Sequence, residues 1–279
     1  MAKDFTHLVL TKFNILTSPK YGPPERRLTD EWLERRLAEF ETFSLPSLRS
    51  QTEQGFSWLV FCDAQSPAWF KRRMSERSGV FEPVWVESIT NATMGTVLRD
   101  RGYTTDLPLI TTRVDNDDAL SRDFVEAVQS LYAGQDRLYI NFPWGLRVCD
   151  GGLFRGYWRS NPFMSLIEQP GHPEGFRGVY SIQHQNVHKT ETVRNVVRPA
   201  TWMRSIHSAN TVKTQVGWPL AHDRSDRFAI DWDRLPAPPT FSRKVAISAD
   251  GYRARLNRSG KYRAAVSALT GRAPGSPGW

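Results

Sequence analysis

Two nearly continuous apolar runs constrain the fold of this chain most strongly. Residues 5–10 read Phe-Thr-His-Leu-Val-Leu, and residues 56–62 read Phe-Ser-Trp-Leu-Val-Phe-Cys. A strand that is buried on both faces is apolar along most of its length, whereas a strand with one solvated face alternates apolar and polar residues. Both runs therefore predict central strands of a sheet that is covered on its two sides.

Helix signals lie between the predicted strands. Thr29-Asp30-Glu31 has the N-cap and the acidic first turn of a helix, and Ser66-Pro67 places a serine before a proline, as at many helix starts. A third strand is expected at residues 84–86, and a helix after Thr93. The order strand, helix, strand, helix, strand predicts a parallel sheet with right-handed crossovers. The 279 residues suffice for one large α/β domain.

The second half of the chain has shorter apolar segments separated by turn residues. Asp150-Gly151-Gly152 predicts a hairpin turn between two of these segments. The segment from Asn161 to Glu168 is expected to open a helix. The expected short strands, several of them antiparallel, are residues 138–142, 146–149, 153–158, 179–184 and 201–207.

The C-terminal part is first proline-rich and then basic. Residues 235–239 read Leu-Pro-Ala-Pro-Pro, which is typical of a stiff linker. From Arg243 to Arg272 there are eight basic residues and one acid, and the whole chain carries a formal charge of +8. Such a surplus favours nucleic acid, an anionic membrane or a phosphorylated substrate as a partner. We therefore expect one domain over residues 1–235, and a linker with a basic helical tail over residues 236–279.

The sequence shows neither a membrane span nor a secretion signal. No run of about 18 apolar residues is present, and the N-terminus lacks a basic segment followed by an apolar stretch. Cys62 and Cys149 each stand beside apolar residues, a setting typical of buried thiols rather than of a disulfide or a zinc site. These features predict a cytoplasmic protein.

Three carboxylates, Asp115, Asp117 and Asp118, follow the β-branched run Ile110-Thr111-Thr112. In an extended segment residues i and i+2 face the same side, so Asp115 and Asp117 would point to one spot. Two carboxylates this close repel each other unless a cation lies between them, and Mn²⁺ and Mg²⁺ prefer oxygen ligands. The simpler alternative is that these acids stabilise the N-terminus of a following helix. A calcium loop is excluded, because Ala119 and Leu120 occupy positions that need an oxygen ligand and a glycine.

Five motifs, spread over residues 5–212, give the chain a resemblance to a known family. They are Leu10-Thr11-Lys12-Phe13-Asn14, Trp58-Leu59-Val60-Phe61-Cys62-Asp63, Thr112-Arg113-Val114-Asp115-Asn116-Asp117-Asp118-Ala119, Phe163-Met164-Ser165-Leu166-Ile167-Glu168 and Trp202-Met203-Arg204-Ser205-Ile206-His207-Ser208-Ala209-Asn210. With them the chain resembles the rhamnosyltransferase family of bacterial glycosyltransferases, within the wider GT-A class. Lys12 stands where that family often has arginine, a change that keeps the charge but loses the planar fork. The residues after about 235 are not covered.

The resemblance implies an α/β fold of GT-A type. Such a fold has a nucleotide-sugar-binding mixed sheet flanked by helices, with a small antiparallel acceptor-side region. Asp115 and Asp117 match the Asp-x-Asp motif that holds Mn²⁺ or Mg²⁺ on the donor diphosphate in this class. A late histidine often adds a further metal ligand, and we expect His207 in that role, with His184 and His188 as rivals.

The resemblance also implies a base and a set of donor contacts. An inverting transferase needs one carboxylate near the acceptor hydroxyl, and we expect Glu168 to be this base, with Asp150 as the next choice. A retaining enzyme would need no such base. The residues expected to contact the nucleotide sugar are Thr11, Lys12, Phe13, Asn14, Asp63, Arg113, Asn116 and Asp118.

These features together predict a metal-dependent glycosyltransferase. It would move a sugar from a UDP-, dTDP- or GDP-sugar to a hydroxyl of a glycan, a lipid-linked saccharide or a protein, and its basic tail would contact an anionic acceptor or membrane. One alternative is a basic nucleic-acid-binding protein, in which the tail and ten tryptophans supply phosphate contacts and stacking surfaces. Another is a metal-dependent nucleotidyltransferase, which would release pyrophosphate.

Overall fold

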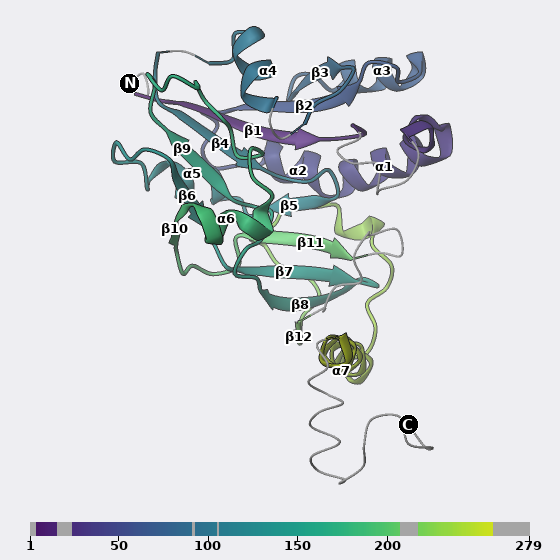
Figure 1. Ribbon diagram of the computed structural model, residues 1–279. Helices are drawn as coiled ribbons and strands as arrows, with labels where there is room; N and C mark the ends of the chain where they lie inside the picture. Colours follow the sequence, from purple (N-terminus) through teal and green to yellow (C-terminus); the bar gives the residue numbers. More distant parts are fainter. Residues whose placement is uncertain (1–3, 16–23, 91–92, 105, 207–216, 259–279) are drawn as a thin grey trace, which may run out of the picture.

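Two sheets organise the structure, a computed structural model that describes residues 4–15, 24–90, 93–104, 106–206 and 217–258 (Figure 1). Sheet A has seven strands in the order β10-β6-β9-β4-β1-β2-β3, and sheet B has five in the order β12-β8-β7-β11-β5. The strands of sheet A are β1 (Thr6–Lys12), β2 (Ser57–Asp63), β3 (Glu82–Val86), β4 (Leu109–Arg113), β6 (Leu138–Asn141), β9 (Ser165–Glu168) and β10 (Thr192–Asn195). Those of sheet B are β5 (Asp118–Leu120), β7 (Trp144–Cys149), β8 (Gly152–Tyr157), β11 (Trp202–Ile206) and β12 (Trp218–Pro219).

Sheet A is parallel in its first half and mixed in its second. Strands β3, β2, β1 and β4 are mutually parallel neighbours, as the alternation of strand and helix signals predicted. Strand β9 then lies antiparallel between β4 and β6, and β10 pairs parallel with β6. The helices are α1 (Asp30–Thr42), α2 (Ser44–Arg49), α3 (Ala68–Ser75), α4 (Met94–Asp100), α5 (Phe124–Gln129), α6 (His184–Thr190) and α7 (Phe241–Arg258), with 3-10 turns at Pro24–Leu28 and Trp232–Arg234.

Both faces of sheet A are covered, which explains the apolar runs. Val9 of β1 packs in one core cluster with residues of α1, α2, α3 and α5, including Leu33 and Phe70. Leu8 and Leu10 point to the other face, into a second cluster with residues of α4 and α6. Successive side chains of a strand point to opposite faces, so a strand between two layers of helices must be apolar throughout. The expected mixed sheet flanked by helices is therefore confirmed.

Sheet B is the smaller, mainly antiparallel region. Its hairpin of β7 and β8 turns at Asp150 and Gly151, which have positive φ values of 49° and 76°. A two-residue turn with two positive φ values matches the twist of the strands it joins. Gly145 of β7 lies directly under the ring of Trp202 of β11, where any Cβ would overlap the ring. Trp202 stacks in turn on Phe163, with ring centroids 5.0 Å apart, and this packing ties sheet B to the core of sheet A.

The chain passes from sheet A to sheet B through Asp115-Asn116-Asp117-Asp118, which we call the acidic motif. Strand β4 ends at Arg113, and β5 begins at Asp118 as the edge strand of sheet B. Three of the four intervening residues are polar. The acidic motif therefore lies at the junction of the two sheets.

Two expectations for the second half of the chain are wrong. The apolar run before Glu168 is strand β9 rather than a helix, because it fills the gap between β4 and β6. A short apolar run does not by itself distinguish a buried strand from a helix. Residues 179–184 form turns that lead into α6, which begins at His184, and no strand lies there.

Helix α7 continues from the proline-rich segment and packs against sheet B. The Lys244 side chain is 1% exposed, and its Nζ lies 2.7 Å from Oδ1 of Asp223 and also donates to the carbonyl oxygen of Leu220. The part of the tail after residue 258 lies outside the described residues, so the predicted boundary at residue 235 stays a prediction. Within the described part of the chain, no helix is both long and apolar enough to cross a bilayer.

Candidate active site

The ends of three parallel strands bring the first predicted site residues to one edge of sheet A. Lys12, Asp63 and Arg113 are the last residues of β1, β2 and β4. These strands are neighbours and run in the same direction, so their carboxyl ends share one edge of the sheet. In open α/β sheets ligands bind outside the carboxyl ends of the strands.

The acidic motif leaves this edge as a tight turn. The backbone N–H of Asp118 donates to the carbonyl oxygen of Asp115 at 3.2 Å, and the Ser44 hydroxyl donates to both the Asp115 and the Asp118 carbonyl oxygens. The segment is thus bent, and the expectation that Asp115 and Asp117 share one side of an extended strand is wrong.

The two aspartates of the motif engage different arginines. Asp115 accepts two hydrogen bonds from Arg113, with both N···O distances at 3.0 Å. Asp117 accepts one from Arg36 of α1, also at 3.0 Å. Arg36 further donates to Glu39 at 2.7 Å and to the Asn116 side-chain oxygen. Paired cations neutralise the clustered acids, as a cluster of this charge requires.

Asp118 belongs to the framework of the site. It is 3% exposed, and its Oδ1 accepts the backbone N–H of Ser205 in β11 at 3.0 Å. Burial raises the pKa of this carboxyl well above its usual range, and Asp117 raises it further, while Arg204 works against the shift. Asp118, Arg204 and Arg147 lie directly opposite one another on three adjacent strands of sheet B, so one face of that sheet carries a row of charges beside the motif.

A tyrosine joins the two cations at the sheet edge. The Lys12 ammonium lies 4.4 Å from the ring centroid of Tyr180, and the Arg113 guanidinium lies 5.0 Å from it. Burial, reinforced by Arg113, lowers the pKa of Lys12 to about 8, and Asp115 partly offsets the shift. Burial raises the pKa of Tyr180, so this phenol stays protonated at neutral pH. The edge thus holds Lys12 beside the Arg113–Asp115 ion pair, a net positive setting that suits an anion.

A tryptophan and a histidine lie beside these cations. The Arg204 guanidinium lies 5.0 Å from the ring centroid of Trp158, and the imidazole of His184 packs edge-on against the same ring at 5.4 Å. Nδ1 of His184 is 2.7 Å from the carbonyl oxygen of Ser160, which can only accept, so Nδ1 carries the proton. Burial, followed by the charge of Arg113, lowers the pKa of His184 to about 4. The imidazole is therefore neutral at pH 7, with its lone pair on Nε2.

Several expected donor contacts lie inside the fold. The Thr11 hydroxyl is buried and accepts the indole N–H of Trp58 at 2.9 Å. Phe13 packs against Phe40 and Phe70 in the core. Because both side chains are buried among core residues, they pack the interior and do not face the edge of the sheet.

Three further predicted residues lie at or next to the carboxyl edge of sheet A. They are Asn14, Asn116 and Asp63. Asn14 is 1% exposed, accepts the backbone N–H of Asp63 and donates to the Ser66 hydroxyl, both at 2.9 Å. Asn116 is also buried, and it donates to the carbonyl oxygen of Phe13 at 3.0 Å. Asp63 is half-buried and accepts the backbone N–H of Gln65 at 2.8 Å. Of the three, Asp63 is the one with an accessible carboxylate.

Glu168 does not lie at the carboxyl edge of sheet A, and its expected role as the catalytic base is not supported. It lies opposite Leu109, the first residue of β4, whereas the acidic motif follows the last residue of that strand. Its two carboxylate oxygens accept the backbone N–H groups of Arg177 and Gly178, each at 2.9 Å, and the residue is 1% exposed. The carboxylate therefore fixes a loop at the other edge of the sheet.

The described residues include only some of the predicted metal ligands. His207 lies outside the described residues, and its rival His188 contacts the Ser160 hydroxyl at 3.1 Å and Asn195 at 3.3 Å. Across the described ranges, no group of three or more histidine, cysteine, aspartate or glutamate side chains could hold a metal ion. Asp115 and Asp117 are both carboxylates within one turn, which is the donor type that a hard divalent cation prefers.

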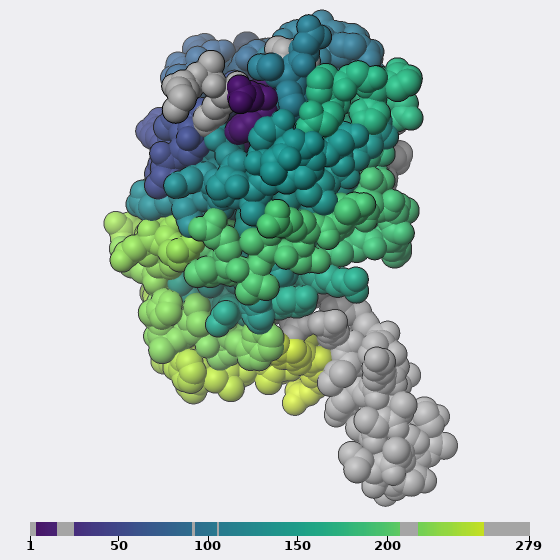
Figure 2. Space-filling model, turned by 90° about the vertical axis from the view of Figure 1, so that its left-hand side faces the viewer, coloured from purple at the N-terminus to yellow at the C-terminus, as the bar shows by residue number. Residues whose placement is uncertain are grey.

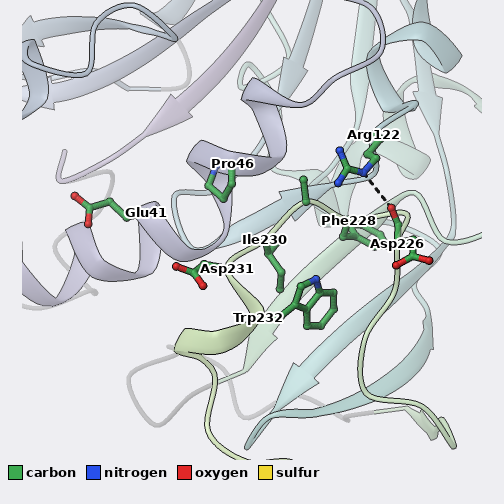
Figure 3. Close-up of a pocket in the computed structure, with 9 residues that line it drawn as sticks. Glu41, Pro46, Arg122, Asp226, Phe228, Ile230, Asp231 and Trp232 are labelled. Carbon is green, nitrogen blue, oxygen red and sulfur yellow. Dashed lines mark hydrogen bonds between the residues drawn. The ribbon is translucent and has the colours of Figure 1, made fainter.

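A pocket of about 730 Å³ lies elsewhere, between α1, α2 and residues 226–232 (Figure 3). Figure 3 shows the Arg122 side chain hydrogen-bonded to the backbone of Asp226. No predicted site residue lines this pocket. Its carboxylates Glu41 and Asp231 are paired with Arg77 and Arg234, so the described lining of the pocket offers no unpaired group of cations for a diphosphate.

The sequence matches a described family over most of its length. The family with the description "Putative rhamnosyl transferase" matches residues 23–218, more than two thirds of the chain. The chain belongs to this family. The resemblance to this family is thereby confirmed. The matched range includes four of the five motifs, among them the acidic motif, and the motif at residues 10–14 lies before it. No protein of curated function matches the sequence.

Three solved structures match the chain in part, at low sequence identity. A fragment of S. aureus TarS, residues 1–349 in complex with UDP, is 12% identical with a TM-score of 0.42, and the match covers 72% of this chain and 60% of that one. HddC from Yersinia pseudotuberculosis is 14% identical with a TM-score of 0.36, over 71% of this chain and 93% of that one. The inositol-1-phosphate CTP transferase from T. maritima is 9% identical with a TM-score of 0.30, over 73% and 90%.

Some residues of the site carry no recognisable signal in the sequence. Arg36 lies in the middle of an amphipathic helix, where an arginine is ordinarily a surface residue. Trp158 ends one of the predicted strands and Tyr180 lies within another, and neither belongs to a motif. Arg204 lies within one of the five motifs, but the sequence alone assigned no role to its charge.

Proposed function

We propose that the chain is a glycosyltransferase that uses a nucleotide-sugar donor. The observation that carries this proposal is the meeting of Lys12, Arg113 and Asp115 at the carboxyl edge of sheet A, in a member of a family described as rhamnosyl transferases. Two partly buried cations on one edge suit a diphosphate, because charge-assisted hydrogen bonds are strongest away from bulk water. Asp63, at the end of β2, would accept hydrogen bonds from the hydroxyl groups of a ribose.

We propose further that Asp115 and Asp117 hold Mn²⁺ or Mg²⁺ when the donor binds. The donor type fits, since both side chains are carboxylates of a single turn, and the divalent ion would take over part of the countercharge that Arg113 and Arg36 now supply. A bound divalent ion supplies positive charge that stabilises the leaving diphosphate without a proton. The chain's own residues set this up, because Arg113 and Arg36 fix the two carboxylates.

We also propose inverting transfer with His184 as the group that accepts the proton of the acceptor hydroxyl. Its lone pair is on Nε2, since Nδ1–H donates to the Ser160 carbonyl oxygen. A pKa of about 4 is close to that of the carboxylates that usually serve as such bases. Glu168, which has its carboxylate bound to two backbone N–H groups, is replaced in this role.

The donor proposal is tested by binding and by products. Thermal shifts with UDP-, dTDP- and GDP-sugars, each with Mn²⁺ or with chelator, should show stabilisation by one donor class that depends on the metal. Asp115→Asn should abolish the shift, whereas Asp100→Asn, a change at an exposed carboxylate on α4, should leave it. Release of a nucleoside diphosphate supports the proposal. Release of pyrophosphate would indicate a nucleotidyltransferase, and an absence of any donor binding would refute the proposal.

A further inference from the structure

The exposed large apolar side chains are concentrated on one part of the surface. Tyr157 is 49% exposed, Trp218 51%, Phe241 53% and Val245 46%. All four belong to β8, β12 and α7, which contact one another. Within the described ranges, the other exposed large apolar residues are Leu107 and Val197, which lie in other parts of the chain. Scattered exposed apolar residues need no explanation, but a contiguous group indicates a binding surface.

Two members of this group, Tyr157 and Trp218, are linked by aromatic contacts that extend to Trp144 and Tyr252. Trp144 lies 5.0 Å from Tyr157 and 6.1 Å from Trp218, and Trp218 lies 6.4 Å from Tyr252, measured between ring centroids. Helical spacing then places Tyr252, Val245 and Phe241 on one side of α7. We call Trp144, Tyr157, Trp218, Phe241, Val245 and Tyr252 together the aromatic patch. In Figures 1 and 2, α7 forms the lower end of the described molecule.

The surroundings of the aromatic patch are basic. The Arg155 guanidinium lies 4.6 Å from the ring centroid of Trp144, and Arg253 of α7 is exposed. The two acids nearest to α7 in the contacts described are already paired, Asp223 with Lys244 at 2.7 Å and Asp250 with Arg253 at 3.3 Å. The sequence adds further basic residues after α7 and no further acid up to Arg272.

The aromatic rings and the positive charge together favour one of three possible binding partners: a second copy of the chain, a neutral glycan or an anionic bilayer. A second copy of the chain would bring one basic surface against another, which like charges disfavour. A neutral glycan could stack on the rings, but it would gain no charge attraction from the basic residues beside them. An anionic bilayer satisfies both features, because tryptophan and tyrosine rings lie at the level of the headgroups and basic side chains are attracted to acidic lipids.

We propose that the aromatic patch docks the protein on the surface of an anionic phospholipid bilayer. Trp218, Tyr157 and Phe241 enter the headgroup region, while Arg155 and Arg253 bind lipid phosphates. The contact is peripheral and requires no spanning segment. This inference goes beyond the transferase proposal, and lipid binding can be measured without any donor or acceptor.

Vesicle flotation with the full-length protein tests the proposal. Vesicles of phosphatidylglycerol mixed with phosphatidylcholine should carry the protein, and pure phosphatidylcholine vesicles should carry far less. The double variant Trp218→Ser/Phe241→Ser should lower the bound fraction about ten-fold or more, since it removes two large apolar groups from the contact. The matched control is Leu107→Ser/Val197→Ser, which removes two exposed apolar residues outside the patch and should float like the wild type.

Four outcomes would overturn the proposal. They are absence of flotation, equal loss in both double variants, equally tight binding of soluble heparin that the patch variant also loses, and a concentration-dependent dimer that the patch variant abolishes. A loss caused by Arg155→Glu and by salt, with no loss in the double variant, would assign binding to charge alone and would also refute a role of the rings. Melting curves show whether the variants fold, and Phe241→Ser alone serves if the double variant does not.

Discussion

Lys12 combines a partly buried position with a charge that donor binding would use. Its pKa of about 8 means that the free protein loses this positive charge in mildly alkaline solution. We expect the affinity for the preferred nucleoside diphosphate, measured by calorimetry at constant Mg²⁺, to fall as pH rises above about 8, by at most ten-fold per pH unit. The sign follows because the protonated form attracts the diphosphate and the neutral form does not.

Two substitutions of Lys12 serve as controls for this pH dependence. Lys12→Met should bind more weakly at pH 7 and should show no dependence between pH 7 and 9. Lys12→Arg keeps its charge over that range, so it should bind tightly with a flat profile. If the wild type and Lys12→Met gave parallel curves, the titrating group would be another one.

His184 and Glu168 differ in what they should do to catalysis and to folding. His184→Gln should spare donor binding and slow sugar transfer by roughly 10²–10⁴-fold, the usual contribution of a general base. Glu168→Gln replaces a buried acceptor of two backbone N–H groups, so it should lower the melting temperature and leave the rate per folded molecule nearly unchanged. Rates normalised to the folded fraction distinguish the two. Wild-type transfer by His184→Gln would point to Asp150 or to a retaining reaction.

At the scale of elements, the junction of the two sheets depends on a glycine. Gly145→Ala would place a methyl group inside the ring of Trp202, which is fully buried, stacked on Phe163 and hydrogen-bonded to the carbonyl oxygen of Phe142 at 2.8 Å. We expect a loss of about 1–3 kcal/mol in the free energy of unfolding, the usual cost of overpacking. Gly79→Ala, where no atom lies within 4 Å of the new methyl group, is the matched control and should be near neutral. Chemical denaturation measures both, and equal stabilities would contradict this account of the junction.

The elements of the first half could be predicted from the sequence, and those of the second half only in part. Strands β1, β2 and β3 with their helices follow from apolar runs and cap signals, which are local features. Strand β9 was mistaken for a helix because its place depends on β4 and β6, from which it is far removed in the sequence. The acidic motif was found for a similar local reason, as its carboxylates stand within four residues.

The partners of that motif could not be predicted, because each is brought in by tertiary structure. Arg36 comes from α1 and Tyr180 from a turn after β9, and nothing local marks either one. Glu168 was misplaced because its strand was misassigned. An antiparallel strand carries its last residue to the opposite edge of the sheet from a parallel one, so the error in the element moved the side chain away from the site.

At the scale of the whole molecule, α7 is part of the fold although its sequence is that of a basic tail. Removing residues 240–279 would leave Asp223 without its buried lysine and would uncover Gly217, whose carbonyl oxygen accepts the Ser248 hydroxyl. We expect this truncation to lower the melting temperature by several degrees, because breaking a buried ion pair is costly. Removing residues 259–279 should leave the melting temperature unchanged, since the contacts of Lys244 and Ser248 remain. Equal melting temperatures of the two truncations, in differential scanning fluorimetry, would show that α7 adds no stability.

Strand β9 also has a consequence for how the chain is made. The four parallel strands β3, β2, β1 and β4 are complete once residue 113 has been synthesised, so they can pair early on the ribosome. Until residues 165–168 follow, however, β4 presents an open edge, and an unpaired edge is a template for association with other chains. The nascent chain is therefore most exposed to misassembly while the ribosome translates the roughly 50 codons between β4 and β9. Slow translation of that stretch would lengthen the exposure, whereas a chaperone that binds extended segments would shorten it.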